Sequence, residues 1–581
     1  MNTATTNTGL ASSVSLALAG SGGAGVMTAG NMLLEAAAQA GYFGLMTRTS
    51  GPQIRGGEAA AMLRIATHAI DGPDDRFDTL VAVDWLNITR FSAEIPLEAD
   101  SLLIGDPAQG PVPEALLASG AQSVPVEFKA LAKSVKGGWP NMVALGLLAG
   151  FAGLPEDAVK AAIEKSMKKG GEALAASIAA MQLGMREAVQ KLPRRRPLAR
   201  PAGARGGRWL VTGNQAAGYG AIRGGVRFVA AYPITPATEL LEWMAPALTR
   251  VGGTLVQAED ELASINMILG ASYGGVPSLT ATSGPGLSLM IESLGLGVAA
   301  EIPIVVVDVM RTGPSTGIAT KTEQGDVNIA LYGLHGDAPH VVVAPNSIGD
   351  CVRATQWAVT LAESLQTPAI VLSDQAFGQA RAVIDRPADL AFTGRRRLAE
   401  ANATDYKRYA LTDSGVSPMA IPGMAGITYT ADGLEHSERG TPSSQASDHL
   451  AQLDKRRRKL ASIDYGDYWA DVEGEGELAV ITFGSCTGPV REAFARARSD
   501  GLNARLVSLR LLSPVQPERL AAALAGVKRA LVIEQNHSAQ FLRYLRGEYD
   551  LAPQLTSFHR PGPLPFRPQE IHRRLLEWSR S

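Results

Sequence analysis

The sequence has 581 residues, 46% hydrophobic and 19% charged, and its 54 basic and 56 acidic residues leave a formal net charge of −2. This composition is typical of a globular chain of about three to five domains, and the balanced charge argues against a nucleic-acid-binding protein. The two cysteines, Cys351 and Cys486, exclude a disulfide scaffold and any four-thiolate zinc or iron–sulfur site within this chain. So few cysteines are also typical of a reducing cytoplasm.

No segment is expected to span or bind a membrane. The longest apolar stretches, Met142–Leu154 and Ile302–Met310, are shorter than the ~20 residues that a spanning helix needs. The apolar run Val14–Gly20 lies near the start of the sequence, but no Lys or Arg precedes Arg48. A signal peptide carries basic residues before its apolar run, so we expect a first β-strand here and a cytoplasmic protein.

Short apolar runs alternate with helical patterns along the chain. In the first part we expect strands at 14–19, 61–67, 78–83 and 101–105, and helices at 142–152 and 172–189. In the middle we expect strands at 209–212, 227–231, 278–282, 303–309 and 368–373, and helices near 236–248, 260–273, 286–299 and 347–364. The last part predicts strands at 477–483, 504–508 and 529–534, and helices at 488–499 and 516–525. Apolar strands that alternate with helices predict an α/β fold of three serial domains with mostly parallel sheets.

Two polar segments separate these parts. Leu192–Arg208 is rich in Pro, Gly and Arg, which predicts a solvated linker rather than a nucleic-acid contact. Gly394–Asp467 shows no clear periodicity and contains the basic run Lys455–Lys459, so we expect a long connecting excursion, of the kind found at interfaces. The predicted boundaries are therefore a first domain at 1–192, a linker at 193–208, a middle domain at 209–393, the excursion at 394–469 and a last domain at 470–581.

A glycine-rich loop, Gly20–Gly25, follows the first predicted strand and opens a helix in the pattern GxGxxG. Glycines allow the backbone to approach a phosphate at the helix N-terminus. A dinucleotide site also needs an acidic residue ~20 positions further on, and 41–51 contains neither Asp nor Glu, which disfavours NAD. Two interpretations stay open, a phosphate-binding loop and a tight turn that binds nothing. The segment Ser50–Glu58, with Arg55, either lines the same cleft or forms a turn.

Three predicted strands of the middle domain end in polar or glycine-rich loops. Tyr232–Pro236 follows the first and leaves Thr235 at its end, Thr280–Gly286 follows the second, and Arg311–Gly317 follows the third. The carboxyl ends of parallel strands meet at one edge of an open sheet, where ligands bind, so we expect a site there. The acidic segment Gln257–Glu261 begins a helix, where its charges also suit the helix dipole.

These segments resemble a known family. GNQAAGYGA, YPITPATE, QAEDELASINMILGAS, ATSGPGLSLM and RTGPSTGIATKTEQGD are similar to the α subunit of 2-oxoacid:ferredoxin oxidoreductases, and GSGGAGVMTAG…TRTSGPQIRGGEA resembles the family's γ domain, fused ahead of α. The resemblance covers nearly the whole chain, and this order is most similar to 2-oxoglutarate enzymes. It implies a γ domain, a domain that binds the pyrimidine of thiamine diphosphate, and a transketolase C-terminal-like domain.

The resemblance also implies a reaction. These enzymes convert 2-oxoglutarate, coenzyme A and two oxidised ferredoxins to succinyl-CoA, CO2 and two reduced ferredoxins, and the reverse direction fixes CO2 in a reductive tricarboxylic acid cycle. The same chemistry on pyruvate, or on a broad range of 2-oxoacids, is the alternative. Two other classes remain: a stand-alone NAD-dependent oxidoreductase, which the missing ribose-binding acid disfavours, and a non-catalytic scaffold for a partner subunit.

Residue roles follow from the resemblance alone. Glu261, nine residues before Gly270, matches the carboxylate that activates thiamine diphosphate, and Glu259 is the competing choice. Arg311 matches the arginine that holds the substrate carboxylate, and Thr235 matches the threonine that bonds the 2-oxoacid or the ring.

Further contacts are implied for the pyrimidine, the substrate and coenzyme A. The pyrimidine contacts are Ser283, Gly284 and Tyr232, the contact to the distal carboxylate of 2-oxoglutarate is Lys321, and the coenzyme A contacts are Gly22, Gly25 and Arg55.

One motif of thiamine enzymes is missing. No GDG sequence, which holds the diphosphate and its metal, occurs here, and Gly105–Pro107 and Gly325–Val327 both differ at the third position. The resemblance therefore implies a β subunit that carries the diphosphate, Mg²⁺ and a [4Fe-4S] cluster, with thiamine diphosphate at the α–β interface, no metal on this chain and an (αβ)2 assembly that reduces ferredoxin. Cys486 is expected to be a buried or turn thiol rather than a nucleophile.

Overall fold

The computed structural model describes residues 9–50, 59–167, 170–201, 207–390 and 393–581. They form two compact units. The first contains the described residues up to Val211 with Ala380–Arg386 and Arg567–Gln569, and the second contains Thr212–Gln379, Pro387–Phe566 and Glu570–Ser581. Over these described ranges, none of the helices has the length and apolar character needed to cross a membrane.

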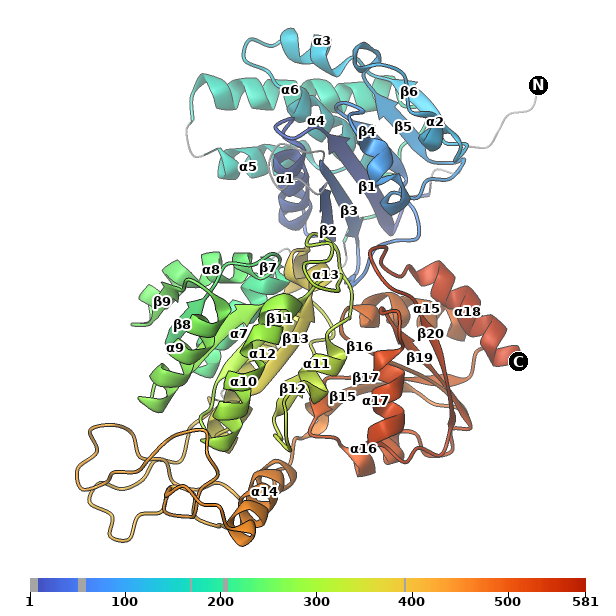
Figure 1. The fold of residues 1–581 in the computed structure, drawn as a ribbon. Coiled ribbons are helices and arrows are strands. Elements are labelled where there is room, and N and C mark those ends of the chain that lie inside the picture. The colour runs from blue at the N-terminus through green and yellow to red at the C-terminus, as the bar shows by residue number, and fades with distance from the viewer. Residues whose placement is uncertain (1–8, 51–58, 168–169, 202–206, 391–392) are drawn as a thin grey trace. The chain divides into compact units, whose positions relative to one another are not determined.

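The first unit is built on an eight-stranded sheet in the order β6-β5-β4-β1-β3-β2-β14-β7 (Figure 1). Its strands are β1 (Ser13–Gly20), β2 (Phe43–Ser50), β3 (Ala59–Ala66), β4 (Thr79–Ala82), β5 (Leu102–Gly105), β6 (Gln122–Pro125), β7 (Arg208–Thr212) and β14 (Arg381–Asp385). Neighbours from β6 to β1 are parallel, whereas β1–β3, β3–β2 and β2–β14 are antiparallel.

Two apolar cores flank this sheet. The helices of the unit are α1 (Val26–Gln39), α2 (Glu114–Leu117), α3 (Phe128–Lys133), α4 (Pro140–Ala152), α5 (Glu156–Ser166) and α6 (Glu172–Gln190). The larger core lies between the sheet and the helices α1, α3, α4, α5 and α6, and α4 is buried over almost its whole surface. The smaller core covers the opposite face with Trp85, Phe91 and Ile95 from an irregular segment and Leu116 of α2.

The second unit contains a seven-stranded sheet in the order β18-β12-β13-β11-β10-β8-β9. Its strands are β8 (Phe228–Ala231), β9 (Thr254–Gln257), β10 (Ser278–Thr282), β11 (Val305–Met310), β12 (Val341–Val343), β13 (Ala369–Asp374) and β18 (Leu511–Ser513). All pairs are parallel except β12–β18. The helices are α7 (Gly213–Gly224), α8 (Thr238–Thr249), α9 (Glu261–Tyr273), α10 (Gly284–Ala299), α11 (Val327–Tyr332), α12 (Asp350–Leu365) and α13 (Gln375–Gly378).

A five-stranded sheet in the order β15-β17-β16-β19-β20 completes the second unit. Its elements are β15 (Ala470–Gly474), β16 (Leu478–Phe483), α15 (Thr487–Ser499), β17 (Ala504–Leu509), α16 (Pro517–Ala523), β19 (Arg529–Glu534), α17 (Gln540–Glu548), β20 (Gln554–His559) and α18 (Pro568–Arg580). The chain passes directly from β17, the second strand of this sheet, to β18, which pairs with β12 at the edge of the seven-stranded sheet.

The predicted α/β fold with three parallel-rich sheets is confirmed, although eight of the strands, β2, β6, β9, β12, β14, β15, β18 and β20, were not expected. Among them, β2 pairs with β3 and makes half of the first sheet antiparallel. Strands β7 and β14, both within the predicted middle domain 209–393, belong to the first sheet. An apolar run identifies a strand but not the sheet that it joins, because pairing partners are chosen by tertiary packing.

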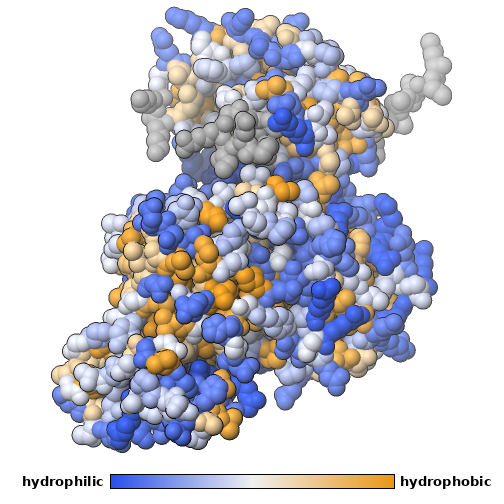
Figure 2. Space-filling model, in the orientation of Figure 1, coloured by the Kyte–Doolittle hydropathy of each residue, from blue (hydrophilic) through white to orange (hydrophobic). Residues whose placement is uncertain are grey.

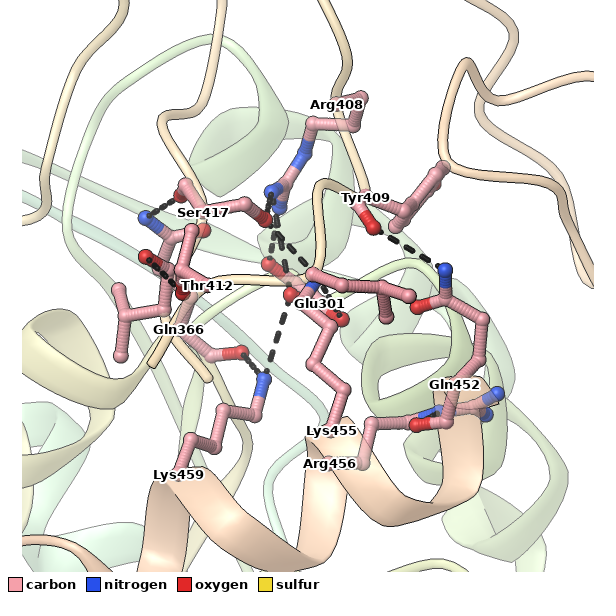
Figure 3. Close-up of polar contacts among 12 residues, drawn as sticks. Glu301, Gln366, Arg408, Tyr409, Thr412, Ser417, Gln452, Lys455, Arg456 and Lys459 are labelled. Carbon is pink, nitrogen blue, oxygen red and sulfur yellow. Dashed lines mark hydrogen bonds and ion pairs between the residues drawn. The ribbon is translucent and has the colours of Figure 1, made fainter. Parts of the chain in front are cut away.

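The excursion after β14 is largely irregular and contains one helix, α14 (Ala446–Ala461), among its described residues. The basic run Lys455–Lys459 lies on α14, where Lys455 and Lys459 are buried rather than solvated (Figure 3). Their amino groups lie 2.8 and 3.4 Å from the carboxylate of Glu301. The helix was missed because its buried face carries lysines instead of the apolar residues that a helical pattern needs.

Arg408 of the excursion completes this cluster. Its guanidinium donates to the main-chain oxygen of Glu301 at 2.8 Å and lies 3.9 Å from the carboxylate. Burial alone raises the pKa of the Glu301 carboxyl, but the neighbouring charges of Lys455, Lys459 and Arg408 outweigh it and hold this pKa at about 2. The cluster therefore holds the excursion against the corner between α10 and β11.

Candidate active site

The carboxyl ends of β8, β10 and β11 bring together three of the predicted loops. Thr235 follows β8, Ser283 and Gly284 connect β10 to α10, and Arg311 comes directly after β11. Arg311 is buried, and its Nη1 donates a hydrogen bond to the main-chain oxygen of Thr235 at 2.7 Å. The loops after β8 and β11 are therefore in direct contact at this edge of the sheet.

Glu261 is the first residue of α9 and is only 7% exposed. The helix begins there because the Asp260 side chain accepts a hydrogen bond from the Ala263 amide at 2.7 Å. A Cβ atom at Gly286 would lie 2.7 Å from Oε1 of Glu261, so the carboxylate rests directly against the glycine loop after β10. Glu259, by contrast, is exposed and precedes the helix. Of the two acids left open by the sequence, the buried one is Glu261.

The loop between β10 and α10 also approaches a second acid. A Cβ atom at Gly284 would lie 2.7 Å from both carboxylate oxygens of Asp326, the residue before α11. Ser283 is fully buried, and its hydroxyl oxygen has no partner among the described residues. Sequence reasoning considered Asp326 only as part of a failed GDG motif. Its position in the sequence could have indicated its role, because Asp326 ends the same RTGPST…QGD segment that starts with Arg311 at the site.

Asp326 and the fully buried Asp308 of β11 form an acidic pair. Burial raises the pKa of Asp308 well above its usual range, and the neighbouring Asp326 raises it further. Burial and Glu323 raise the pKa of Asp326 to about 6, although the Arg311 charge opposes them. Neither carboxylate oxygen of Asp308 has another partner among the described residues. The pair therefore holds at least one proton at neutral pH, since two adjacent buried carboxyls do not both ionise.

Arg311 has a donor to spare for an anion. Its Nε is buried and lacks a hydrogen-bond partner within the described part of the chain. Burial lowers the pKa of the guanidinium, which Asp326 partly offsets, but an arginine stays charged in proteins. A planar guanidinium with unused N–H groups is well suited to a carboxylate.

The other predicted site residues do not all lie in the same unit of the structure. Tyr232 follows β8 and is 40% exposed, and Lys321 lies on the loop after Arg311, where its main-chain oxygen accepts from the Thr312 amide at 2.9 Å. Gly22 and Gly25 belong to the other unit, in the turn before α1. Arg55 lies outside the described residues.

The turn before α1 is already occupied by protein groups. The Ser21 amide and hydroxyl both donate to the carboxylate of Asp84, at 3.0 and 2.8 Å. Gly25 has φ 76°, and a Cβ atom there would lie 2.2 Å from the Asn141 amide nitrogen. These contacts explain the glycine at 25 by close packing, and they place a negative charge where a phosphate would approach the Ser21 amide.

Three family models match the chain. Residues 15–187 match the pyruvate ferredoxin/flavodoxin oxidoreductase model, 219–455 match the thiamine-diphosphate-binding domain of pyruvate flavodoxin/ferredoxin oxidoreductases, and 476–554 match core domain II of pyruvate:ferredoxin oxidoreductase. The α subunit of 2-oxoacid:ferredoxin oxidoreductase 2 from Aeropyrum pernix is 30% identical over 93% of this chain and 94% of its own length. The chain belongs to the 2-oxoacid:ferredoxin oxidoreductases.

The chain is also similar to two proteins described as 2-oxoglutarate oxidoreductases. A solved structure of the 2-oxoglutarate:ferredoxin oxidoreductase from Magnetococcus marinus, with 2-oxoglutarate, coenzyme A and succinyl-CoA bound, is 35% identical with a TM-score of 0.90 and covers 98% of this chain and 99% of that one. The KorA subunit of 2-oxoglutarate oxidoreductase from Mycobacterium tuberculosis is 35% identical over 70% of this chain and 64% of its own length. The predicted family is confirmed, and the stand-alone NAD-dependent alternative gives way to an oxidoreductase subunit.

The residues at the sheet edge fit the pyrimidine end of thiamine diphosphate. They lie within the matched thiamine-diphosphate-binding domain, and among the described residues they offer a buried carboxylate at Glu261, an unpartnered hydroxyl at Ser283 and a half-buried glycine at Gly284. The cysteines do not contribute, because burial raises the pKa of both the Cys351 and the Cys486 thiols well above the usual range. Cys486 is the buried thiol that was expected.

Proposed function

We propose that this chain is the catalytic α subunit of a thiamine-diphosphate-dependent 2-oxoglutarate:ferredoxin oxidoreductase. The reaction converts 2-oxoglutarate, coenzyme A and two oxidised ferredoxins to succinyl-CoA, CO2, two reduced ferredoxins and one proton. The observation that carries the proposal is the meeting of Glu261, Ser283 and Arg311 at one sheet edge. The likeness to relatives described as 2-oxoglutarate enzymes supports the substrate.

Each residue has a proposed role. When bound, thiamine diphosphate supplies the carbon nucleophile for the 2-oxo group and the electron sink for decarboxylation. The Glu261 carboxylate accepts a hydrogen bond from the aminopyrimidine ring and holds the proton that activates it, while Ser283, Gly284 and Tyr232 contact the ring. A buried carboxyl is suited to this role because it exchanges a proton without competition from water.

The substrate is held by the loops after β8 and β11. Arg311 binds its 2-oxo carboxylate and Thr235 bonds the oxo group or the ring, in keeping with their direct contact. Lys321 meets the distal carboxylate of 2-oxoglutarate. A second candidate is turnover of pyruvate or of several 2-oxoacids, favoured by the pyruvate family models and by the 2-oxoacid relative from Aeropyrum pernix.

A β subunit is the expected partner. The sequence lacks the GDG motif, so the diphosphate, Mg²⁺ and a [4Fe-4S] cluster belong to β in an (αβ)2 cytoplasmic enzyme that reduces ferredoxin. Leu262 and Met267 of α9 and Leu289 of α10 are exposed. Figure 2 shows apolar surface over the part of the chain where Figure 1 labels α9 and α10. Apart from its chain neighbours and the nearby backbone of α9, no atom among the described residues lies within 4 Å of where a Cβ at Gly270 would be. A partner on this face would cover the helix that begins at Glu261.

Coenzyme A is proposed to contact the first unit near Gly22, Gly25 and Arg55. The glycine loop before α1 supports this assignment because its pattern is that of a phosphate-binding turn. The Asp84 carboxylate at Ser21 counts against a phosphate on that particular amide.

The test is purification of the chain together with a co-expressed β subunit, followed by a panel of 2-oxoacids with coenzyme A and ferredoxin or viologen. We expect 2-oxoglutarate to give the highest kcat/KM, and the chain without β to give no turnover. Faster turnover of pyruvate would replace 2-oxoglutarate by the second candidate. Turnover by the isolated chain would contradict the proposed division of the cofactor.

The Asp326→Asn substitution is expected to remove a pH dependence of substrate binding. The pKa of Asp326 is raised to about 6, so above this pH its negative charge competes with a substrate carboxylate for Arg311. In the wild type the Kd of the 2-oxoacid should therefore fall several-fold as the pH falls from 7.5 to 5.5, whereas in D326N it should change little. Direct binding titrations at both pH values measure this.

Other ionisable groups near Asp326 are Asp308, Glu323 and Arg311. D326N leaves all of them in place, so a pH dependence that persists in the variant would assign it to one of these groups or to the substrate. Glu323→Gln is the comparison variant, because it keeps Asp326 but removes a charge that raises the pKa of Asp326. In E323Q the pH dependence should persist, with its midpoint at a lower pH.

A further inference from the structure

The segment between Arg311 and α11 connects the candidate site with the five-stranded sheet. Its residue Gln324 is fully buried at the carboxyl ends of β16 and β19. The main-chain N–H of Gln324 donates to the main-chain oxygen of Gln535 at 2.8 Å. The side-chain Oε1 of Gln324 accepts from the main-chain N–H of Gln535 at 2.9 Å. Its Nε2 donates to the main-chain oxygen of Phe483 at 3.0 Å, and the Cys486 thiol donates to Oε1 at 3.3 Å.

The glycine after β16 is shaped to receive this side chain. Gly484 has φ 60°, a conformation that L side chains rarely adopt, and a Cβ atom there would lie 2.7 Å from Nε2 of Gln324. The same short segment provides the Phe483 oxygen and the Cys486 thiol. The segments Phe483–Cys486 at the end of β16 and Glu534–Asn536 at the end of β19 therefore form a binding pocket, called the receptor, for the side chain of Gln324.

The residues next to Gln324 are held against the same sheet. Gln540 of α17 donates through Nε2 to the main-chain oxygen of Gly325 at 2.8 Å and accepts through Oε1 from the Asn328 amide at 2.9 Å. The Gly562 amide donates to Glu323 at 3.2 Å. The end of the segment is thus held on both sides of Gln324 by side chains and main chain of the predicted last domain, residues 470–581, called the third domain below.

Both ends of this segment lie in the candidate site. Arg311 stands at its start and donates to Thr235. Asp326 stands at its end, two residues after Gln324, with its carboxylate against Gly284. Asp326 is joined to Gln324 by only two peptide bonds, so displacement of Gln324 from its receptor also displaces Asp326. It also removes a fixed point of the segment that carries Arg311 and Lys321.

We propose that Gln324 is a positioning residue for the substrate, through which the third domain holds the segment 311–326 in its binding geometry. This inference rests on the proposed function, in which Arg311 and Lys321 contact the 2-oxoacid.

The test is steady-state kinetics of the α–β complex with Gln324→Ala. Truncation leaves the Phe483 oxygen and the Gln535 amide without their partner, and buried polar groups favour an arrangement that satisfies them. We expect the KM for the 2-oxoacid to rise at least tenfold, while the KM for coenzyme A stays within twofold. Gln452→Ala is the matched control, since Gln452 is also buried and bonds one main-chain oxygen, that of Tyr409, outside the site.

Gln324→Glu separates positioning from general stability. The new carboxyl group has nearly the same shape, but it donates to the Phe483 oxygen only when protonated. The ratio of the Q324E and wild-type KM values for the 2-oxoacid should therefore be largest at pH 8 and fall toward one as the pH decreases. Ionisable groups near position 324 are Glu323, Asp326 and Cys486, with Asp374, Glu534 and Arg560 around Cys486. Because a charge at 324 would also shift the titration of Asp326, the ratio is measured in the Asp326→Asn background, as Q324E/D326N against D326N.

Three results would overturn the inference. They are an unchanged KM in Q324A, a loss of kcat with unchanged KM values, which marks a merely structural role, and a Q324E ratio that does not vary with pH. If Q324A does not assemble with β, the pH series on Q324E provides the same decision. Absent 2-oxoacid turnover in the wild-type complex would reject the proposed function as well, whereas normal wild-type turnover with an unchanged Q324A KM rejects this inference alone.

Discussion

Glu261→Gln is expected to lower kcat of the α–β complex by roughly 10²–10⁴-fold, the range for loss of a positioned acid–base group. The side chain is buried at the start of α9, and its carboxylate rests against Gly286 in the loop after β10. Glutamine keeps the shape of this side chain but does not exchange a proton near neutral pH. The loss should therefore fall on kcat, while thiamine diphosphate still binds. Viologen reduction at saturating substrate measures the rate, and cofactor retention after gel filtration measures binding.

The matched control is Glu259→Gln, two residues earlier. Glu259 is an exposed acid of the same segment, so its loss should change kcat less than twofold. Near-normal kcat in E261Q with a large loss in E259Q would reverse the assignment. Near-normal kcat in both variants would mean that neither acid of this segment activates the cofactor.

Glu301→Ala is expected to lower the free energy of unfolding by about 3–5 kcal/mol, the usual cost of leaving buried charge without its partner. Lys455, Lys459 and Arg408 all contact Glu301 in the interior, and no other acid is ion-paired with any of the three among the described residues. The substitution leaves three cations around an empty space. Urea unfolding of the purified chain measures the loss, and limited proteolysis of 393–469 shows whether the excursion detaches.

The pH dependence of this variant has a defined sign. Burial lowers the pKa of Lys459 to about 7, opposed by Glu301, so without Glu301 this lysine loses its proton at a still lower pH. The defect of E301A should therefore be smaller at pH 8, where Lys459 is neutral, than at pH 6. In the wild type the Glu301 contribution is present above a pKa of about 4.5 and is lost as the pH falls toward about 2.

The control is Glu438→Ala, in the same excursion. Glu438 forms an ion pair with Lys407 at 3.3 Å, and both side chains are about one-third exposed, so its loss should cost less than about 1 kcal/mol. Equal losses in E301A and E438A would contradict the anchoring role of the buried cluster.

Much of the fold and part of the site were predictable from local pattern. The runs that became β10 and β11 are apolar over the length of a buried strand, and each is followed by glycine or polar residues. The carboxyl ends of parallel strands converge at one edge of a sheet, so the loops with Thr235, Ser283 and Arg311 were expected together. Strand β2 was missed because its sequence, FGLMTRTS, alternates weakly and mixes polar with apolar residues.

The sequence by itself determined the α/β class, the three loops at one sheet edge and the family, because each depends on periodicity and motifs within short segments. Only the tertiary structure decided which acid is buried, Glu261 rather than Glu259, and that Asp326 lies against Gly284. It also decided that Lys455 and Lys459, from a run of basic residues, surround the Glu301 carboxylate. It placed the Gln324 side chain in hydrogen-bonding contact with the end of β16. Burial and charge pairing depend on contacts between residues far apart in the chain, which local sequence does not encode.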